Sequence, residues 1–380
     1  MAAACWRHTS PAHPTMFNAR RHATRSVICA LTALPLGLGA QAGEDSVTGR
    51  RRLQPLPAIG SSPETGLQLG ATLLGVHEPP PSMRARPTAL VASVLRSTRG
   101  QMRASAEGEH WTADNRWRWH GLLAWQRFPM PYHGIGDRTT SDSGMQYASR
   151  SMEVVFTAQR RVRGAWYATA GARWMQQRIR NGADVRTLVA TPEPLGTDGG
   201  TIVETTVGMQ HDSRDGLFAP MSGGLTQLSV TTSAPGASFD YERLRMDTRR
   251  YIPLGRGQVL ALHALLLGTS PGAPFDQLAL AGGADMLRGY ARGRFREEWL
   301  MAGQLEYRSP IRKRVGAVVF TGLGAVGRDM PALRRALPLP TVGAGLRYQL
   351  DAVQRTAIRV DYGRGRSGAS GLYIGFNQAF

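Results

Sequence analysis

The chain has 380 residues, of which 42% are hydrophobic and 19% charged, and its formal net charge at pH 7 is +19. After residue 42 no run of 18 apolar residues occurs and the mean hydropathy of the chain is negative, which argues against a helical membrane protein. The arginines are spread along the chain and do not form one cluster, so the positive charge does not indicate nucleic-acid binding.

The first 42 residues have the features of a cleaved export signal. Arg20, Arg21 and Arg25 precede an apolar run from Val27 to Leu38, and Ala40-Gln41-Ala42 is a suitable cleavage site. A transmembrane anchor is the alternative, but the apolar run is too short and too interrupted for a span of about 20 residues.

Both cysteines, Cys5 and Cys29, lie within this signal. The signal carries four arginines and no acidic residue, so the charge of +19 becomes +15 after cleavage. The mature chain is therefore expected to contain no disulfide and no thiolate metal site.

Beyond the signal, apolar residues recur at every second position, which is the period of a β-strand. Ile358, Val360 and Tyr362, for example, lie on one face of a strand, and Arg359 and Asp361 lie on the other. Segments of about ten residues with one apolar and one polar face are typical of transmembrane β-barrel strands.

Sixteen such segments follow one another, and an even number fits a single-chain bacterial barrel. The predicted strands are 66–77, 86–97, 100–110, 115–127, 131–138, 146–160, 164–178, 202–212, 224–234, 239–252, 257–269, 298–309, 314–326, 341–350, 355–363 and 371–380. The fifth is the weakest because it is short and rich in Gly and Pro. We therefore predict an all-β fold, a 16-stranded antiparallel transmembrane β-barrel over 63–380, after a short periplasmic lead at 43–62.

The parity of the strands predicts on which side each connection lies. With a periplasmic N-terminus, the predicted extracellular loops are 78–85, 111–114, 139–145, 179–201, 235–238, 270–297, 327–340 and 364–370, and turns such as Thr98-Arg99 are periplasmic. The longest connection contains the basic segment 282–296. A loop of this size is usually functional or disordered.

The last predicted strand, 371–380, is apolar on one face and ends in an aromatic residue. Such a strand resembles the signal by which outer-membrane barrels are recognised for insertion, and its candidate residues are Tyr373, Gly375, Phe376 and Phe380. Gln378 departs from this pattern because it stands where an apolar residue is expected. The alternative is an ordinary final strand.

The long basic loop carries Arg288-Gly289-Tyr290, preceded by Gly282-Gly283. This sequence resembles the arginine-glycine-aromatic motif of the outer-membrane assembly-factor and two-partner-secretion transporter superfamily, also called the bacterial surface antigen family. The resemblance implies a 16-stranded barrel whose sixth extracellular loop folds into the lumen and carries the motif as a lock.

Three further places resemble the same family in the expected order. They are Tyr132-His133-Gly134-Ile135-Gly136-Asp137, then Asp212-Ser213-Arg214-Asp215 with Pro220, and then Glu306-Tyr307-Arg308 together with Phe320-Thr321-Gly322. We interpret the periplasmic turn motif Asp212, Arg214, Asp215 and Pro220 as structural and not catalytic, because a polar cluster followed by Pro and Gly is suited to closing a turn.

The chain departs from the family in two ways. Only 43–62 precede the barrel, which is too short for a polypeptide-transport-associated domain, so a barrel-only member is expected. The family's aspartate two residues after Phe320 is replaced by Gly322. Because an unpaired buried guanidinium costs several kcal/mol, we predict that Arg288 pairs with the inward-facing Glu306, with Phe320 as a second candidate contact. The alternative is a solvated Arg288 in a mobile loop.

Motifs for chemistry are missing from the sequence. It contains no Gly-x-Ser-x-Gly elbow, no phosphate-binding Gly-rich loop and no His-Glu-x-x-His pair, and His263 stands alone in its strand. We expect no enzymatic activity, no cofactor and no bound metal.

The resemblance implies that the protein inserts or translocates polypeptides at the bacterial outer membrane. Its partners would be outer-membrane lipid, client polypeptides or accessory periplasmic proteins, and no nucleic acid, with a seam that opens between 66–77 and 371–380. Two alternatives are a structural surface-antigen barrel and a passive pore. The pore would favour anions because Arg243, Arg245 and Arg249 share an inward face, although Asp247 lies there too.

Overall fold

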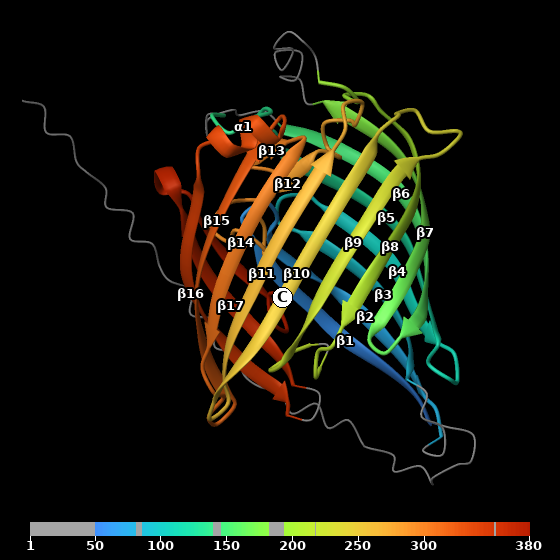
Figure 1. Cartoon of the computed structure of the whole chain (residues 1–380), viewed down its shortest axis with the longest axis vertical. Coiled ribbons are helices and arrows are strands. Elements are labelled where there is room, and N and C mark those ends of the chain that lie inside the picture. The colour runs from blue at the N-terminus through green and yellow to red at the C-terminus, as the bar shows by residue number, and fades with distance from the viewer. Residues whose placement is uncertain (1–49, 81–85, 140–145, 182–193, 217, 353–354) are drawn as a thin grey trace, which may run out of the picture. The chain divides into compact units, whose positions relative to one another are not determined.

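The computed structural model describes residues 50–80, 86–139, 146–181, 194–216, 218–352 and 355–380. Within these residues, sixteen strands pair antiparallel in sequence order and the first closes on the last, which makes a closed barrel (Figure 1). The predicted all-β fold and 16-stranded barrel are confirmed. The expected signal, 1–42, lies outside the described residues.

The barrel strands are β1 (Arg50–Ser62), β2 (Gly66–Glu78), β3 (Thr88–Ser97), β4 (Met102–Trp111), β5 (Trp117–Pro131), β6 (Gln146–Arg163), β7 (Trp166–Asn181), β8 (Gly199–Asp212), β9 (Gly223–Ser233), β10 (Glu242–Gly255), β11 (Gln258–Thr269), β14 (Trp299–Arg308), β15 (Val315–Gly327), β16 (Leu339–Asp351), β17 (Thr356–Gly365) and β18 (Ser370–Phe376). A separate two-stranded sheet, β12 (Ala279–Ala281) and β13 (Phe295–Glu297), lies between β11 and β14 in sequence. The short helix α1 (Met330–Arg335) joins β15 to β16.

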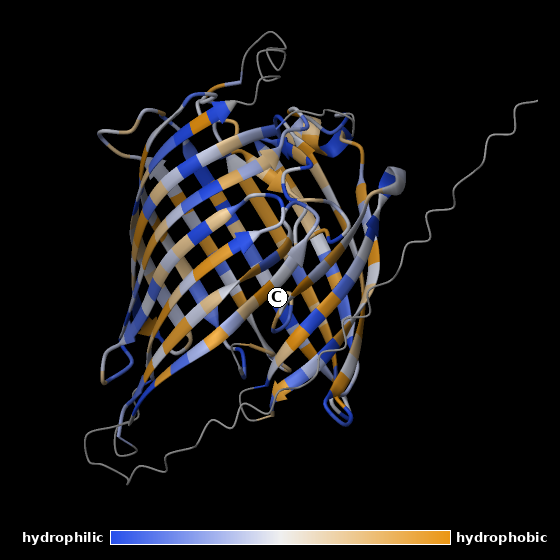
Figure 2. Cartoon of the chain, turned by 180° about the vertical axis from the view of Figure 1, so that it is seen from behind, coloured by the Kyte–Doolittle hydropathy of each residue, from blue (hydrophilic) through white to orange (hydrophobic). Residues whose placement is uncertain are grey.

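Apolar side chains face outward from the strands. On β15, Val319 and Leu323 are 53% and 56% exposed, whereas Val318 and Phe320 are buried inside the barrel. Figure 2 shows the same alternation of hydrophobic and hydrophilic residues along neighbouring strands. An exposed apolar outer surface on a closed barrel is what a lipid environment requires. No helix in the described part of the chain is long and apolar enough to cross a membrane.

The first barrel strand lies where the sequence pattern predicts a lead segment, so the predicted lead at 43–62 is wrong. Residues 50–62 form β1, which pairs with β2 along its whole length. Pro55 and Pro57 conceal this strand in the sequence. Proline removes a ladder hydrogen bond and is therefore confined to edge strands, and β1 meets this condition because its other side is almost unpaired.

The predicted fifth strand, 131–138, is also wrong. Beyond Pro131 this segment is irregular, and only Gly136 forms an isolated bridge, to Arg296. Gly134 and Gly136 have φ angles of +84° and +122°, which an extended strand does not allow. The count of sixteen is thus correct because one missed strand and one false strand cancel.

Adding β1 and removing the predicted strand at 131–138 changes the end of the barrel on which each connection between them lies. We call the end with the connections 132–145, 182–198 and 270–298 the loop end, and the other end the turn end. The segments 78–85 and 111–114, predicted to be extracellular, belong to the turn end, and Thr98-Arg99 belongs to the loop end. The hydrogen bond from Arg161 Nη2 to Asp114 O (3.1 Å) agrees, because Arg161 lies in β6 at the turn end.

The C-terminal strand is shorter than the predicted 371–380. β18 ends at Phe376, and Asn377 has a φ of +60°, which turns the chain out of the strand. Phe380 then lies inside the barrel, where it is 6% exposed and its ring centroid is 5.0 Å from that of His263. Gln378 therefore does not occupy a strand position.

The corrected order of strands predicts which end each early connection faces. The described residues contain no cysteine, so Ala113→Cys and Arg99→Cys would each place one reactive thiol on an exposed residue. We expect a membrane-impermeant maleimide to label Arg99→Cys on intact cells and Ala113→Cys only after the outer membrane is permeabilised. The opposite result would restore the order of strands predicted from the sequence.

Candidate functional site

The connection between β11 and β14 is an ordered loop with a hairpin of its own. β12 and β13 pair through Ala279 with Glu297, Leu280 with Arg296 and Ala281 with Phe295. The tip of the loop is closed by a hydrogen bond from Gly283 N to Tyr290 O (3.0 Å). Its apolar side chains pack against the inner surface of the barrel wall in one buried cluster: Met286, Leu287, Tyr290, Phe295, Leu300, Ala302, Val326 and Leu339.

Arg288 at this tip is completely buried, and it has two carboxylate partners. Nη1 donates to Asp361 Oδ2 of β17 at 2.6 Å, and Nη2 pairs with Glu306 Oε2 of β14. The guanidinium carbon lies 3.5 Å from the centroid of the Phe320 ring, which adds a cation–π contact. The contact with Glu306 is therefore present, and Asp361 is an additional partner that the sequence analysis missed.

Two further arginines of the barrel wall complete the network. Arg308 Nε donates to Glu306 Oε1 at 2.9 Å, and Arg347 Nη1 donates to Asp361 Oδ1 at 2.5 Å. Three buried guanidinium groups thus share two buried carboxylates. Removing Arg288 would leave both carboxylates with fewer partners in a site that excludes water, and breaking such a buried pair typically costs about 3–5 kcal/mol.

Glycines on the wall make room for the main chain of the motif. Gly289 has a φ of +122°, and a Cβ atom there would lie 2.7 Å from the main-chain carbon of Arg364. A Cβ on Gly363 of β17 would lie 2.5 Å from the carbonyl oxygen of Arg288. The loop and β17 therefore approach each other as closely as two backbones can, which only glycine permits on both sides.

Gly322, two residues after Phe320, also lies close to its neighbours. It pairs in register with Gln304 of β14 and Thr341 of β16. A Cβ atom there would lie only 2.8 Å from Thr341 Oγ1. The second carboxylate that pairs with Arg288 comes from Asp361 on β17, two strands further along the wall.

Tyr373 and Tyr290 attach the loop to the C-terminal strands. The hydroxyl of Tyr373 accepts from Gly289 N (2.9 Å) and donates to Tyr290 O (3.0 Å), and Tyr373 is 1% exposed. The hydroxyl of Tyr290 donates to Pro340 O (3.0 Å) and accepts from Arg366 N (2.8 Å). Tyr373, named above as part of a terminal signal, thus faces inward and holds the loop. Gly375 and Phe376 lie further along β18, and Phe376 faces outward.

The turn between β8 and β9 is held by its own carboxylates. Arg214 donates to Asp212 through Nε (2.9 Å) and Nη2 (2.8 Å). Asp215 accepts from Arg355 Nη1 at 2.9 Å and from the amide of Met221 at 2.8 Å. Burial raises the pKa of Asp215, but the Arg355 hydrogen bond and the amides more than offset this and hold the pKa below its usual range. These contacts close a turn.

Arg308 joins this turn to the buried network and to the last residue. Its Nη1 donates to Pro220 O (3.3 Å) and its Nη2 donates to the main-chain oxygen of Phe380 (2.7 Å). Because its Nε holds Glu306, one side chain connects the two motifs that the sequence showed separately.

Several other charged residues of the lumen are paired with each other. Asp247 accepts from Arg245 (2.5 Å) and Arg249 (3.1 Å) and contacts His263 Nε2 at 3.1 Å. Arg243 pairs with Glu204 at 3.3 Å. In the part of the chain that the structure describes, no group of three or more His, Cys, Asp or Glu side chains could hold a metal ion.

The fold and this site define a class of protein: an outer-membrane β-barrel of sixteen strands in which a loop holds a buried arginine against the inner wall. The Omp85 superfamily domain matches residues 105–367, which is more than half of the chain. The protein belongs to the Omp85 superfamily.

Two solved structures share the fold. BamA from Haemophilus ducreyi lacking POTRA domains 1-3 is similar with a TM-score of 0.61 and 15% identity, over 86% of this chain and 70% of that chain. CdiB from Acinetobacter baumannii is similar with a TM-score of 0.56 and 12% identity, over 87% of this chain and 66% of that chain. No curated protein sequence matches the chain.

The buried network predicts a specific loss of stability. Arg288→Gln removes one of three cations that share two buried carboxylates. We therefore expect the free energy of unfolding of the barrel to fall by about 3 kcal/mol. Heat-modifiability on gels, measured as the temperature at which the folded band disappears, tests this. Arg334→Gln on the exposed face of α1 is the matched control. Equal unfolding temperatures for the two variants would contradict a structural role of the Arg288 pairs.

Proposed function

We propose that the protein inserts polypeptides into the outer membrane by pairing them with the free edge of β1. The observation that supports this most directly is the seam of the barrel. β1 and β18 are in register at one residue pair only, Ser61 with Ile374, whereas β17 and β18 pair over seven residues. The barrel therefore closes at this seam with almost no ladder.

The unpaired part of β1 is a template for another strand. β1 has 13 residues and β18 has seven, so most of the β1 edge facing β18 has no strand partner. Unsatisfied main-chain groups are costly in a membrane, and a free edge recruits a further strand by main-chain hydrogen bonding. A client β-strand supplies these groups.

Two prolines keep this edge free. Pro55 and Pro57 lie within the continuous ladder to β2, opposite Leu73 and Ala71. Proline has no N–H to donate, so its tolerated place in a strand is at a side without a ladder partner. The two rings remove donors from the side that faces β18, which opposes full closure of the barrel.

The lumen reaches the seam from inside. A cavity of about 600 Å³ is lined by Gly60 and Ser61 of β1, by Ile374 of β18 and by polar residues of the opposite wall. Because the Arg288 loop is fastened to β17 and β18, the C-terminal side of the seam is braced and the β1 side is free to separate.

The superfamily resemblance supports the same role, and a client polypeptide delivered by accessory periplasmic proteins is the partner we propose. No enzymatic step is needed, because strand exchange replaces one set of hydrogen bonds by another. An anion-selective pore has less support, since the lumenal Arg243, Arg245 and Arg249 are held by Glu204 and Asp247.

A disulfide across the seam tests the proposal. Ser61→Cys with Ile374→Cys places two thiols on the one pair that joins β1 and β18. We expect the oxidised protein, reconstituted in vesicles, to fold a second outer-membrane barrel no faster than empty vesicles, and reduction to restore the acceleration. The control pair Ser93→Cys with Ser105→Cys joins β3 to β4, whose hydroxyls lie 3.0 Å apart in the continuous wall. Full activity with the seam cross-linked would exclude insertion through it.

The prolines give an independent test. Pro55→Ala with Pro57→Ala restores two N–H donors to the seam edge, so we expect longer pairing of β1 with β18, a higher unfolding temperature and slower folding of the second barrel. Pro253→Ala in β10, a strand proline near the β10–β11 turn and away from the seam, is the control. Faster client folding in the double variant would show that the prolines do not keep the edge free.

A further inference from the structure

Three arginines form a row on the outer surface near the loop end. Arg127, Arg150 and Arg178 lie on the adjacent strands β5, β6 and β7, and the register places Arg127 opposite Arg150 and Arg150 opposite Arg178. All three are exposed. They share the outward face with exposed apolar residues of the same strands, such as Trp125 and Met152. Their charged groups therefore point away from the lumen.

A fourth arginine extends this row. Arg96 of β3 is exposed and pairs in register with Met102 of β4, which in turn pairs with Arg127. Neighbouring strands are about 4.8 Å apart, so the row spans roughly 10 Å from Arg127 to Arg178 and roughly 19 Å from Arg96.

Among the residues that the structure describes, the row has no counter-charge. Like charges directly opposite each other on neighbouring strands are destabilising. None of the four side chains makes a hydrogen bond or an ion pair with a residue that the structure describes. Several arginines inside the barrel, by contrast, have carboxylate partners, as Arg173 has in Glu153 (2.7 Å). An external anion would remove the repulsion along the row.

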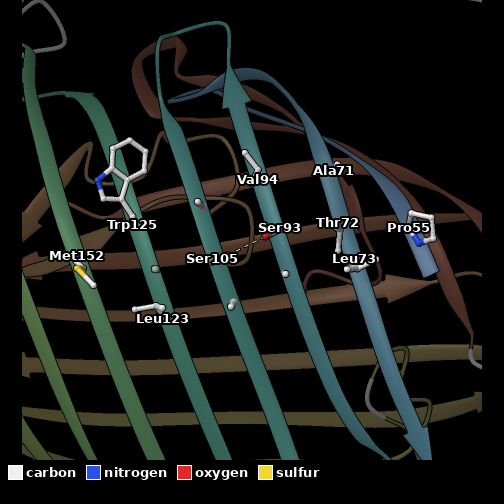
Figure 3. Close-up of a pocket in the computed structure, with 14 residues that line it drawn as sticks. Pro55, Ala71, Thr72, Leu73, Ser93, Val94, Ser105, Leu123, Trp125 and Met152 are labelled. Atoms are coloured by element: carbon white, nitrogen blue, oxygen red, sulfur yellow. Dashed lines mark hydrogen bonds between the residues drawn. The ribbon is translucent and has the colours of Figure 1, made fainter. Parts of the chain in front are cut away.

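An apolar groove lies directly beside the arginine row, on the side of the turn end. It begins two residues away from the row on each strand. From Arg96, Met102, Arg127 and Arg150 toward the turn end, these residues are Val94, Ala104, Trp125 and Met152. The groove has a volume of about 540 Å³. It is lined by small residues, Ala71, Ala92, Ala104 and Ala106, and by large ones such as Leu73 and Trp125. Figure 3 shows Leu73 and Trp125 on different strands of this face. Small side chains on β2–β4 beside large ones on β5 and β6 produce this hollow.

We propose that this face binds an outer-leaflet saccharolipid with two phosphates, whose phosphates lie on the arginine row and whose acyl chains lie in the groove. Guanidinium groups bind phosphate oxygens with paired hydrogen bonds, and two arginines are enough for one phosphate. A row of three or four therefore matches more than one phosphate. The loop end of such a barrel faces the cell exterior, which places the row in the outer leaflet. This inference does not depend on the seam.

Lipid binding by the purified protein in detergent tests the proposal. The probes are bis-phosphorylated lipid A, monophosphoryl lipid A and phosphatidylglycerol, each titrated and followed by native mass spectrometry. We expect lipid A with two phosphates to bind tightest. Arg127→Gln with Arg150→Gln and Arg178→Gln should weaken it at least about tenfold. The control Arg312→Gln with Lys313→Gln and Arg314→Gln removes the same charge from an exposed turn at the other end and should bind normally.

The groove is tested separately from the charges. Ala92→Phe with Ala104→Phe fills the floor and leaves all arginines in place, so we expect weaker binding of lipid A and normal heat-modifiability. Equal binding of phosphatidylglycerol and lipid A would overturn the choice of a saccharolipid. If the row variant and the 312–314 turn variant lose the same affinity for lipid A, the binding is non-specific attraction to surface charge. If the row variant binds lipid A as tightly as the unchanged protein, the proposed site is wrong.

Discussion

The site depends on the burial of one guanidinium group. Arg288 has no contact with solvent, and its charge is tolerable only because Glu306 and Asp361 are held on either side of it. Those two carboxylates come from β14 and β17, so the loop ties together strands on both sides of β15 and β16. The wall in turn carries glycines where the loop main chain passes, since any side chain there would separate the ion pairs.

The same buried charge network connects the C-terminal strands of the barrel to one another. Arg308 and Arg347 balance the carboxylates, and Arg308 extends the connection to Pro220 O and to the oxygen of Phe380. β7 also bonds to the loop, through Arg173 to Gln277 (3.1 Å) and Gln177 to Asp276 (2.7 Å), but among the described residues no side chain of β1 makes a hydrogen bond or an ion pair with the loop. The difference between a braced half and a free first strand is the basis for the function proposed.

Period-two alternation was sufficient to predict the fold, since it identifies strands wherever one face meets lipid and the other the lumen. It failed at β1 because Pro55 and Pro57 are poor strand residues, and whether a strand is an edge can only be known from its neighbours. It failed at 131–138 because Gly134 and Gly136 adopt positive φ, which the hydropathy pattern does not reveal. The partner Glu306 could be expected from inward alternation. Asp361 is inward by the same pattern, but its distance from Arg288 along the chain hid the contact.

One consequence follows from the position of Tyr373. It lies on β18, the C-terminal edge of the seam, and its hydroxyl carries the hydrogen bonds to Gly289 and Tyr290. An outward movement of β18 would have to draw the loop out of the lumen. Among the described residues β1 itself has no side-chain bond to the loop; the contact nearest to it in sequence is that of Arg292 N with Glu64 Oε2 (3.4 Å), in the turn after β1. The two edges of the seam therefore differ: β18 is held to the loop and β1 is not, so under the function proposed above each incoming strand would be added at β1.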